Sequence, residues 1–260
     1  MNQRRVLYLL NPAAGALFGA MDRADDGANA NYNGLIAKVQ HRFSQNFTLL
    51  ASYTYSHCLQ DAQIVVNDLG NGPRFQDPSN RNADYGSCEY DVRHSFVSSL
   101  VVASPRFASK WANVLLGDWQ LSPIVSARTG IPFNPTAGQD NSRTGEGVDR
   151  PNVVGDPYVR DLNSRAWLNP AAFVANAVGE FGNAGWNSLR GPGFFNIDVG
   201  LSRSFPVREG HRVQLRFEFF NATNHANFSN PTGNITSSNF GRILSAGDPR
   251  ILQFALKYTF

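Results

Sequence analysis

The last ten residues of the chain, Ile251-Leu252-Gln253-Phe254-Ala255-Leu256-Lys257-Tyr258-Thr259-Phe260, decide the fold. Apolar or aromatic side chains occupy positions 252, 254, 256, 258 and 260, and polar side chains occupy positions 253, 257 and 259. Successive side chains of a β-strand point to opposite faces of the sheet. This period of two therefore predicts a strand with one apolar face.

Four earlier segments repeat the alternation, at residues 35–43, 47–56, 195–205 and 213–219. We interpret residues 95–103 and 115–129 as two strands of less regular pattern, and Pro123 interrupts the second or marks a bulge. Typical globular strands have about 5 or 6 residues, whereas most of these segments have 9 to 11. A tilted strand needs about 9–11 residues to cross a bilayer, so the lengths predict membrane-crossing strands.

Composition narrows the class of protein. Charged residues make up 17% of the chain and aromatic residues 12%, whereas a soluble domain carries about 25% charged residues. The net charge of +3 is small and dispersed, so we expect no nucleic-acid partner. The start of the chain, Arg4-Arg5-Val6-Leu7-Tyr8-Leu9-Leu10, lacks the features of a signal peptide. We therefore expect that Met1 is not the natural start of an exported protein.

The connections between the predicted strands alternate in length. Short connections fall at residues 44–46, 105–114 and 206–210, and long ones at 58–90, 130–194 and 224–250. Outer-membrane barrels have short periplasmic turns and long extracellular loops. The alternation therefore predicts that every short connection is periplasmic, every long one is extracellular, and the chain ends at the periplasmic rim.

Two residues, His41 and Arg203, carry polar or charged groups on otherwise apolar strand faces. In the predicted topology both lie near the periplasmic interface. An Arg costs about 0–1 kcal/mol there, against roughly 2–4 kcal/mol at the bilayer midplane. Aromatic residues expected to form girdles at the two interfaces, with ordinary core positions as the alternative, are Tyr53, Tyr55, Trp119 and Tyr258.

Several stretches carry a family pattern. The most specific is Arg216-Phe217-Glu218-Phe219-Phe220-Asn221-Ala222-Thr223-Asn224-His225. Others are Asn31-Tyr32-Asn33-Gly34-Leu35, Asp91-Val92-Arg93-His94-Ser95-Phe96, Gly117-Asp118-Trp119-Gln120-Leu121 and Leu189-Arg190-Gly191-Pro192-Gly193-Phe194. With them, residues 31–260 resemble the C-terminal barrel region of TonB-dependent receptors of the Oar-like type, which have a carboxypeptidase-regulatory-like domain.

The resemblance implies an all-β fold, an antiparallel transmembrane β-barrel segment that is an incomplete part of a barrel of about 22 strands with a plugged lumen. Residues 1–260 would be the C-terminal part of the barrel domain, and residues 1–30 a poorly defined leading segment or loop. The chain shows no plug domain, TonB box or regulatory-like domain, so we expect a fragment or a split gene product.

The function implied by the resemblance is uptake of an unidentified substrate across the outer membrane, without enzymatic activity and without cofactors. The expected partners are outer-membrane lipid and the barrel assembly machinery. The plug and the energy-coupling complex would be partners only in a full-length receptor. One alternative is a small self-contained outer-membrane barrel with an adhesive or structural role, with an eighth strand from residues 3–10. Another is a secreted carbohydrate-binding β-sandwich.

The two cysteines, Cys58 and Cys88, lie at the ends of one long connection. In an oxidising compartment they form a disulfide or remain two free thiols. With His57, Asp91 and His94 they raise a less favoured hypothesis of a metal site or a Cys–His nucleophile, which no motif spacing supports. We predict no catalytic, cofactor-binding or metal-binding residue.

Other candidate residues have structural interpretations that we favour. Asp140, Glu146, Asp149 and Asp156 suit a calcium loop only weakly, because the DxDxDG pattern is missing. Gly191-Pro192-Gly193 is expected to form a tight turn before the strand at Phe195. The lumen-facing charges expected from the alternation are Arg212, Arg216, Glu218 and Lys257. Tyr258 and Phe260 resemble the terminal signal that the assembly machinery of outer-membrane barrels recognises.

Overall fold

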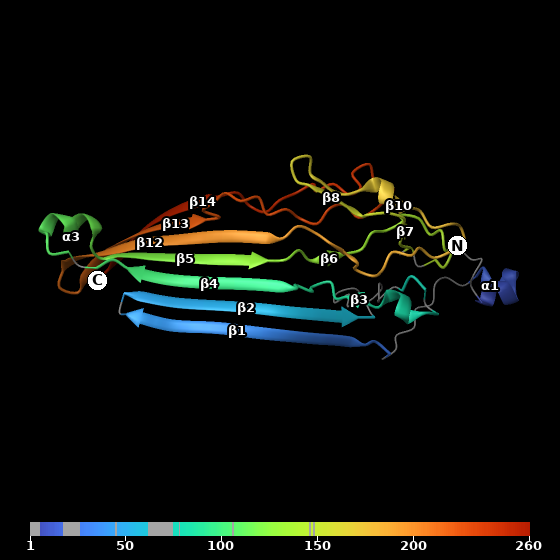
Figure 1. Cartoon of the computed structure of the whole chain (residues 1–260), viewed down its shortest axis with the longest axis horizontal. Helices are drawn as coiled ribbons and strands as arrows, with labels where there is room; N and C mark the ends of the chain where they lie inside the picture. Colours follow the sequence, from blue (N-terminus) through green and yellow to red (C-terminus); the bar gives the residue numbers. More distant parts are fainter. Residues whose placement is uncertain are drawn as a thin grey trace.

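The computed structural model describes residues 6–17, 27–44, 46–61, 75–77, 79–105, 107–145, 147 and 149–260. Its main element is one antiparallel sheet in the order β1-β2-β4-β5-β12-β13-β14, with the short strand β3 attached to β2 (Figure 1). The long strands are β1 Ala30–Ser44, β2 Phe47–Gln60, β4 His94–Ala103, β5 Trp119–Arg128, β12 Phe194–Arg208, β13 His211–Phe220 and β14 Ile251–Thr259. Each long strand pairs with the next one in chain order, so the predicted all-β antiparallel sheet is confirmed.

The remaining elements lie before β1 or in the connections. The short strands are β3 Gly86–Ser87, β6 Pro132–Phe133, β7 Asn152–Val153, β8 Tyr158–Asp161, β9 Ala166–Leu168, β10 Phe173–Val174 and β11 Leu189–Arg190. The helices are α1 Val6–Leu10, α2 Pro12–Gly15 and α3 Lys110–Leu116, with the 3-10 turns η1 Arg81–Asp84 and η2 Pro170–Ala172. No helix in the described part of the chain is long and apolar enough to span a membrane.

The strand register joins the alternating patterns into one apolar face. Residues directly opposite each other in a ladder project to the same side of the sheet. One such row crosses four strands through Pro123, Val199, Phe219 and Leu252. Since this register continues from β1 to β14, the apolar sides predicted separately for the strands share one face.

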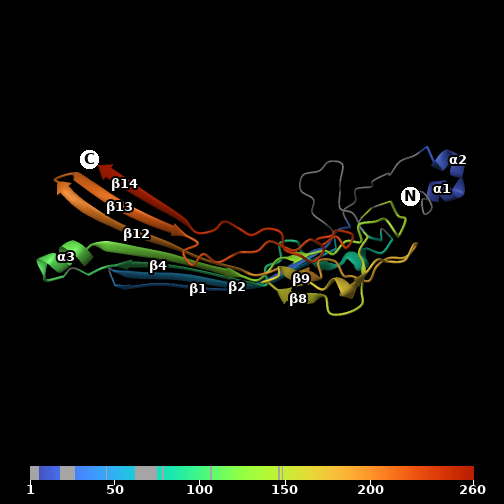
Figure 2. The same ribbon diagram turned by 90° about the horizontal axis from the view of Figure 1, so that it is seen from above.

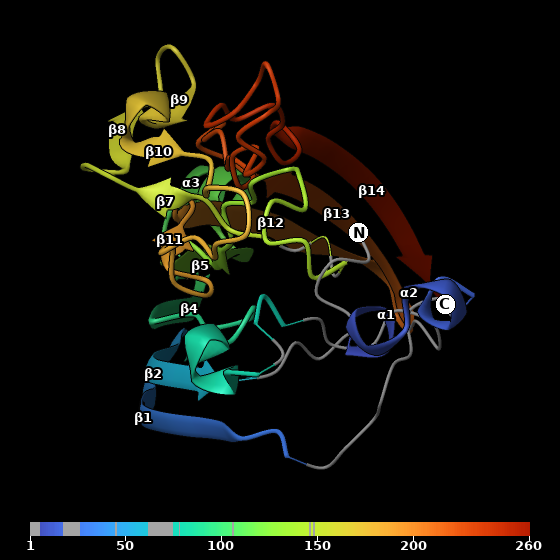
Figure 3. The same cartoon turned by 90° about the vertical axis from the view of Figure 1, so that its right-hand side faces the viewer.

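The sheet is curved and open. Viewed along the strands, it bends from β1 round to β14 like part of a barrel wall (Figure 3). Seen from above, β14 lies away from β1 (Figure 2). Among the described residues no pairing joins these two strands, so each leaves one unpaired edge.

Short and long connections lie at opposite ends of the sheet. The β12–β13 turn, α3 and the C-terminus share the left end in Figure 1, and the long connections gather at the right end. We call this second assembly the loop cap and define it as the described residues of 61–93, 129–193 and 221–250. Its core comprises Leu168, Ala172, Phe173, Leu189 and Phe240.

Local predictions differ from the structure at the β4–β5 connection. Residues 115 and 116 belong to helix α3, and β5 begins at Trp119. In α3 the apolar residues recur at the helical spacing of three and four, at 111, 114 and 115, which explains why a period of two was the wrong interpretation there. Pro123 produces no register shift, although the β4–β5 pairs stop at Ile124 and resume at Leu121.

The proposed eighth strand from residues 3–10 is wrong where the structure describes it, because Val6–Leu10 is helix α1. Its run of consecutive apolar residues has no alternation that would make one face of a sheet. The eighth strand of the sheet is instead β3, in the connection between β2 and β4. Residues 3–5 lie outside the described residues.

Candidate functional site

The loop cap is organised around one disulfide and two ion pairs whose carboxylates are buried. Cys58, near the end of β2, is bonded to Cys88, and their Cα atoms are 5.3 Å apart. The bond fixes the start of the β2–β4 connection against its end, 30 residues later. Because both thiols are consumed, the hypothesis of a Cys–His nucleophile fails. His94 instead accepts or donates a hydrogen bond at 2.7 Å with the Tyr53 hydroxyl.

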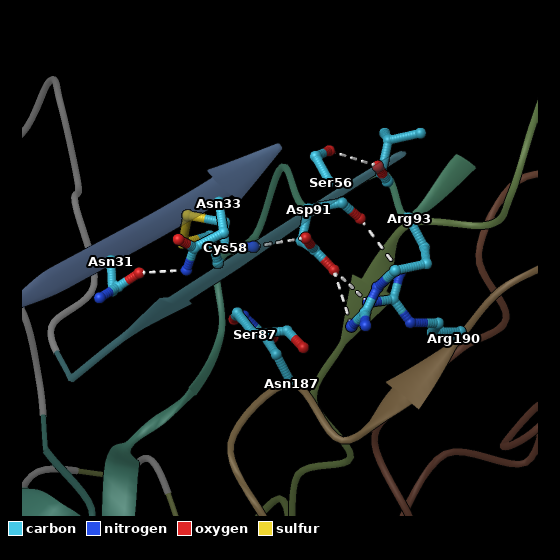
Figure 4. Close-up of a disulfide and its surroundings, with 11 residues drawn as sticks. Asn31, Asn33, Ser56, Cys58, Ser87, Asp91, Arg93, Asn187 and Arg190 are labelled. Atoms are coloured by element: carbon cyan, nitrogen blue, oxygen red, sulfur yellow. Dashed lines mark hydrogen bonds and ion pairs between the residues drawn. A yellow bond between two sulfur atoms is a disulfide. The ribbon is translucent and has the colours of Figure 1, made fainter. Parts of the chain in front are cut away.

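The first ion pair joins Asp91 to Arg190 beside the disulfide (Figure 4). The Asp91 carboxylate is 1% exposed and also accepts a hydrogen bond of 2.8 Å from the Cys58 backbone N–H. The Arg190 guanidinium donates to the carbonyl oxygens of Asp91 at 3.1 Å and Gly130 at 3.2 Å. The pair thus ties the β2–β4 connection to the β5–β12 connection at the ends of the long strands.

The second ion pair joins Asp84 to Arg150 deeper in the loop cap. Their side chains are 5% and 3% exposed. Arg150 also donates to the carbonyl oxygens of Ala184 at 2.7 Å and Ala83 at 2.9 Å. The Gln76 backbone N–H donates to Asp84 at 2.8 Å. Because a buried charge is costly unless it is paired and hydrogen-bonded, these additional bonds are what make the buried pair tolerable.

Glycines allow close packing of backbone at this junction. A Cβ atom on Gly130 would overlap the carbonyl oxygen of Gly191, and one on Gly182 would overlap the carbonyl oxygen of Arg150. Gly191 lies in the Gly191-Pro192-Gly193 segment, which forms an irregular link between β11 and β12 and not the predicted tight turn. The link is held to the β5 side by a hydrogen bond of 3.1 Å from Gly191 N–H to the Ile131 carbonyl.

Of the acidic residues considered for calcium, Asp140 and Asp149 meet at the Ser142 hydroxyl, which lies within hydrogen-bond distance of both carboxylates. Asp149 accepts from the Ser142 N–H at 2.6 Å and from Asn176 at 3.0 Å, so its carboxylate holds a loop. Asp140 accepts from Gly145 N–H and Asp156 from Tyr158 N–H, each at 3.0 Å. Within the described ranges no cluster of three or more potential metal-binding residues exists, and Glu146 lies outside them. The structure therefore gives the calcium hypothesis no support.

A half-buried carboxylate of the loop cap, that of Asp161, also caps a local turn. The Ser164 hydroxyl and the Asn163 backbone N–H both donate to Asp161, and these bonds lower the pKa of that carboxyl below its ordinary value of 3.8. Hydrogen bonds to the charged form favour it, which accounts for the direction of the shift. Asp161 thus acts within the β8–β9 hairpin.

The predicted lumen charges share the polar face of the sheet. Arg212, Arg216 and Glu218 alternate along β13, and Lys257 lies opposite Gln214 in the β13–β14 ladder. Arg216 forms an ion pair with Glu218 on this face. Arg212 and Gln214 also line a polar cavity of about 320 Å³ near the short-connection end, with residues of β5 and β12.

A second cavity, of about 440 Å³, lies where the strands meet the loop cap. Its lining residues are Tyr53, His94, Phe96, Ala127, Arg128, Thr129, Gly130, Gly193 and Phe194. The Arg128 guanidinium lies 5.0 Å from the centre of the Phe194 ring. The mixture of aromatic rings and one cation suits binding of an apolar group that carries an acceptor or a negative charge.

The C-terminal residues are anchored on one side only. The Tyr258 hydroxyl shares a hydrogen bond of 2.6 Å with His211, and its ring centre lies 5.9 Å from that of Phe260. Phe260, which directly follows β14, is 88% exposed. The two aromatic side chains predicted as an assembly signal are therefore adjacent and exposed.

Sequence reasoning missed the residues that organise the molecule at both ends. Neither ion pair was expected, although Asp91 and Arg190 each belong to a stretch that carries the family resemblance. The opposite charges of Asp91 and Arg190, in two such stretches, were the signal from which this ion pair could have been predicted. Arg203 was recognised only as a tolerated charge. In the structure it is 8% exposed and donates to the Val114 carbonyl of α3 at 2.5 Å.

The comparisons with known proteins agree with this architecture. A family model described as "Outer membrane beta barrel domain" matches residues 1–253, which include the long strands up to the start of β14. No curated protein matches the sequence.

Proposed function

The chain belongs to the outer membrane β-barrel domain family and is located in the outer membrane, and from that premise we propose that it is the C-terminal part of a TonB-dependent receptor of the Oar-like type. In this proposal the seven long strands are one sector of the barrel wall. The loop cap contributes to ligand capture on the cell surface, and the chain itself catalyses no reaction. A plug, supplied by another part of the full-length receptor, would control passage through the lumen.

The observation that carries the proposal is the open sheet with one continuous apolar face. In a bilayer every backbone N–H and C=O needs a protein partner, so unpaired strand edges are very costly. β1 and β14 each have such an edge within the described chain. Additional strands that close a larger barrel would satisfy both edges, as expected for a wall sector of a large receptor.

The loop cap supports a capture role. Outer-membrane barrels extend long loops to the outside and keep their periplasmic turns short. A loop assembly with its own core, two ion pairs with buried carboxylates and a disulfide presents a preorganised surface, which reduces the entropy cost of binding.

Aromatic residues at the two ends of the strands support lipid and the barrel assembly machinery as the proposed partners. Aromatic residues on the apolar face lie near the loop cap at Tyr53 and Tyr55, and near the short connections at Trp119 and Tyr258. Such belts are typical of lipid interfaces. The exposed pair Tyr258 and Phe260 would be recognised by the barrel assembly machinery.

The first experiment tests size and orientation in the native membrane. An antibody against residues 158–168 should detect an outer-membrane protein considerably larger than 28.6 kDa. In intact cells a membrane-impermeant maleimide should label Ser164→Cys in the loop cap and leave Glu209→Cys in the β12–β13 turn unlabelled until the outer membrane is opened. A stable, heat-modifiable barrel of 28.6 kDa would support the self-contained alternative and contradict the receptor proposal.

The second experiment tests uptake without assuming a ligand. Cells with and without the gene are grown in the same complex medium, and the spent media are compared by mass spectrometry. We expect at least one compound to be consumed only by cells with the gene, and a protonophore should abolish its uptake. Consumption that does not depend on the gene, or that is insensitive to the protonophore, would contradict energy-coupled import.

A further inference from the structure

Helix α3, at the short-connection end, has its apolar side chains on the outside. Trp111 is 78% exposed, Val114 51% and Leu115 68%. Residues three and four positions apart lie on the same side of a helix, so these three form one stripe. On the protein side, Asn113 accepts a hydrogen bond of 3.1 Å from Phe107 N–H. In water this distribution would be the reverse of that of an ordinary surface helix.

The helix is held against the apolar face of the sheet. Arg203 lies in the apolar row of β12, opposite Trp119 of β5. Its guanidinium donates to the carbonyl oxygens of Val114 at 2.5 Å and Asn113 at 3.2 Å. The Trp119 indole N–H donates to the Leu115 carbonyl at 3.0 Å. These bonds occupy the last carbonyl groups of α3 and place its stripe beside the face that barrels of this family turn toward lipid.

We propose that α3 is an interfacial membrane anchor, whose stripe of Trp111, Val114 and Leu115 enters the boundary between headgroups and acyl chains of the adjacent leaflet. The partner is a phospholipid surface. An apolar helical side, with a Trp at the level of the headgroups, is the chemistry that such a boundary binds. The stripe extends the lipid-facing surface of the strands, and this continuity distinguishes lipid from a protein partner.

Arg203 has a positioning role in this anchor. The aliphatic part of its side chain lies along apolar surface. Its guanidinium carbon lies 5.6 Å from the centre of the Trp119 ring and 4.7 Å from that of Phe205. The guanidinium donates to helix carbonyls next to hydrocarbon, where an unpaired carbonyl group is costly. The inference rests on the outer-membrane location of the chain and not on the receptor proposal.

Spin-label accessibility tests the anchor in the full-length protein, reconstituted in vesicles of phosphatidylethanolamine and phosphatidylglycerol. Nitroxides are attached to Trp111→Cys and Leu115→Cys, and collisions with oxygen and with a water-soluble nickel complex are measured. The matched control is Glu209→Cys, an exposed position at the same end of the sheet. The oxygen-to-nickel ratio should be several-fold higher at 111 and 115 than at 209.

Each other outcome contradicts the anchor. A ratio at 111 and 115 equal to that at 209 would mean that the stripe lies in water. Low collision rates with both reagents would mean that a protein covers it. Quenching by brominated lipid provides a second readout in otherwise native protein: Trp111→Phe should remove part of the quenchable tryptophan fluorescence. An unchanged quenchable fraction would overturn the proposal even if labelling disturbs the helix.

Discussion

In the loop cap, Leu168 and Phe173 are buried in one apolar core. In the sheet, Leu252, Phe254 and Leu256 are exposed. Among the described residues every buried apolar side chain except Cys58 lies in the loop cap. The two regions therefore have different solvents. The loop cap folds as a water-exposed domain does, with apolar groups inside, and the sheet presents its apolar face to lipid.

Charged side chains also differ in exposure between the loop cap and the sheet. In the loop cap, Asp84 and Asp91 are almost completely buried, and each accepts hydrogen bonds on both carboxylate oxygens. On the polar face of the sheet, the Arg216 side chain is 51% exposed although it is paired with Glu218. A buried pair leaves a desolvated charge when one partner is removed, and an exposed pair does not. Removing one charge of a pair should therefore destabilise the loop cap more than it destabilises the sheet.

The largest effect is expected for Asp84→Ala in the loop cap. It leaves the Arg150 guanidinium buried without its carboxylate, at a cost of about 3–5 kcal/mol to the loop cap. Hydrogen exchange in full-length protein should show faster exchange throughout the loop cap and unchanged protection in the long strands. Arg150→Met with Asp84→Leu is the control, because removing both charges should restore much of the protection. Equal loss of protection in the strands would erase the distinction between the two regions.

The disulfide is the next strongest element. Replacing both Cys58 and Cys88 by Ser frees a connection of 30 residues and should destabilise the loop cap by about 3–4 kcal/mol. Limited proteolysis of vesicle-embedded protein should then cut residues 61–93 first. Wild-type protein treated with a reductant is the parallel sample. Resistance to protease in both samples would show that the ion pairs alone hold the loop cap.

A charge on the apolar face tests the lipid side of the comparison. Leu201→Arg, in the middle of β12 and opposite Leu121 and Phe217, should destabilise the barrel by about 2–4 kcal/mol in vesicles. Ser202→Arg, on the polar face one residue later, should have a much smaller effect. Urea unfolding in vesicles measures both. If the two substitutions cost the same, the faces are assigned wrongly.

The exposed ion pair should contribute little. Arg216→Ala should lower barrel stability by less than about 1 kcal/mol, because the pair is largely solvated. Glu218→Gln is the matched change of the other partner. A cost comparable to that of Asp84→Ala would mean that this face is dry and not a water-filled lumen.

The smallest effect concerns pH. The pKa of Asp161 is lowered in the folded protein, so its contribution to the β8–β9 hairpin is present above the ordinary value of 3.8 and is lost as pH falls through the lowered pKa. Exchange of the Asn163 amide should accelerate only in that acidic range. Asp161→Asn should remove the pH dependence. Acceleration near neutral pH would contradict the assignment.

The strands were predictable because their determinants are local. A period of two assigns each residue of β12, β13 and β14 to a face without knowledge of its neighbours. The resulting faces of Val199, Phe219 and Leu252 coincide in the ladder. Helix α3 was missed because a short apolar segment satisfies strand and helix patterns almost equally well.

The loop cap was not predictable in the same way. Asp91 and Arg190 are 99 residues apart, and Asp84 and Arg150 are 66 apart. Neither separation belongs to a period, and Gly-, Asn- and Pro-rich connections suit many conformations. Which carboxylate meets which guanidinium depends on where the strand ends bring the connections together.

The sequence by itself determined the strands, their two faces, the order of short and long connections and the aromatic C-terminus, because each is encoded in neighbouring residues. Only the tertiary structure decided that Cys58 meets Cys88, that Arg190 reaches Asp91, and that Arg203 holds α3 on the apolar face. Those contacts join distant segments, and their energy is gained only when the curved sheet places the segments side by side.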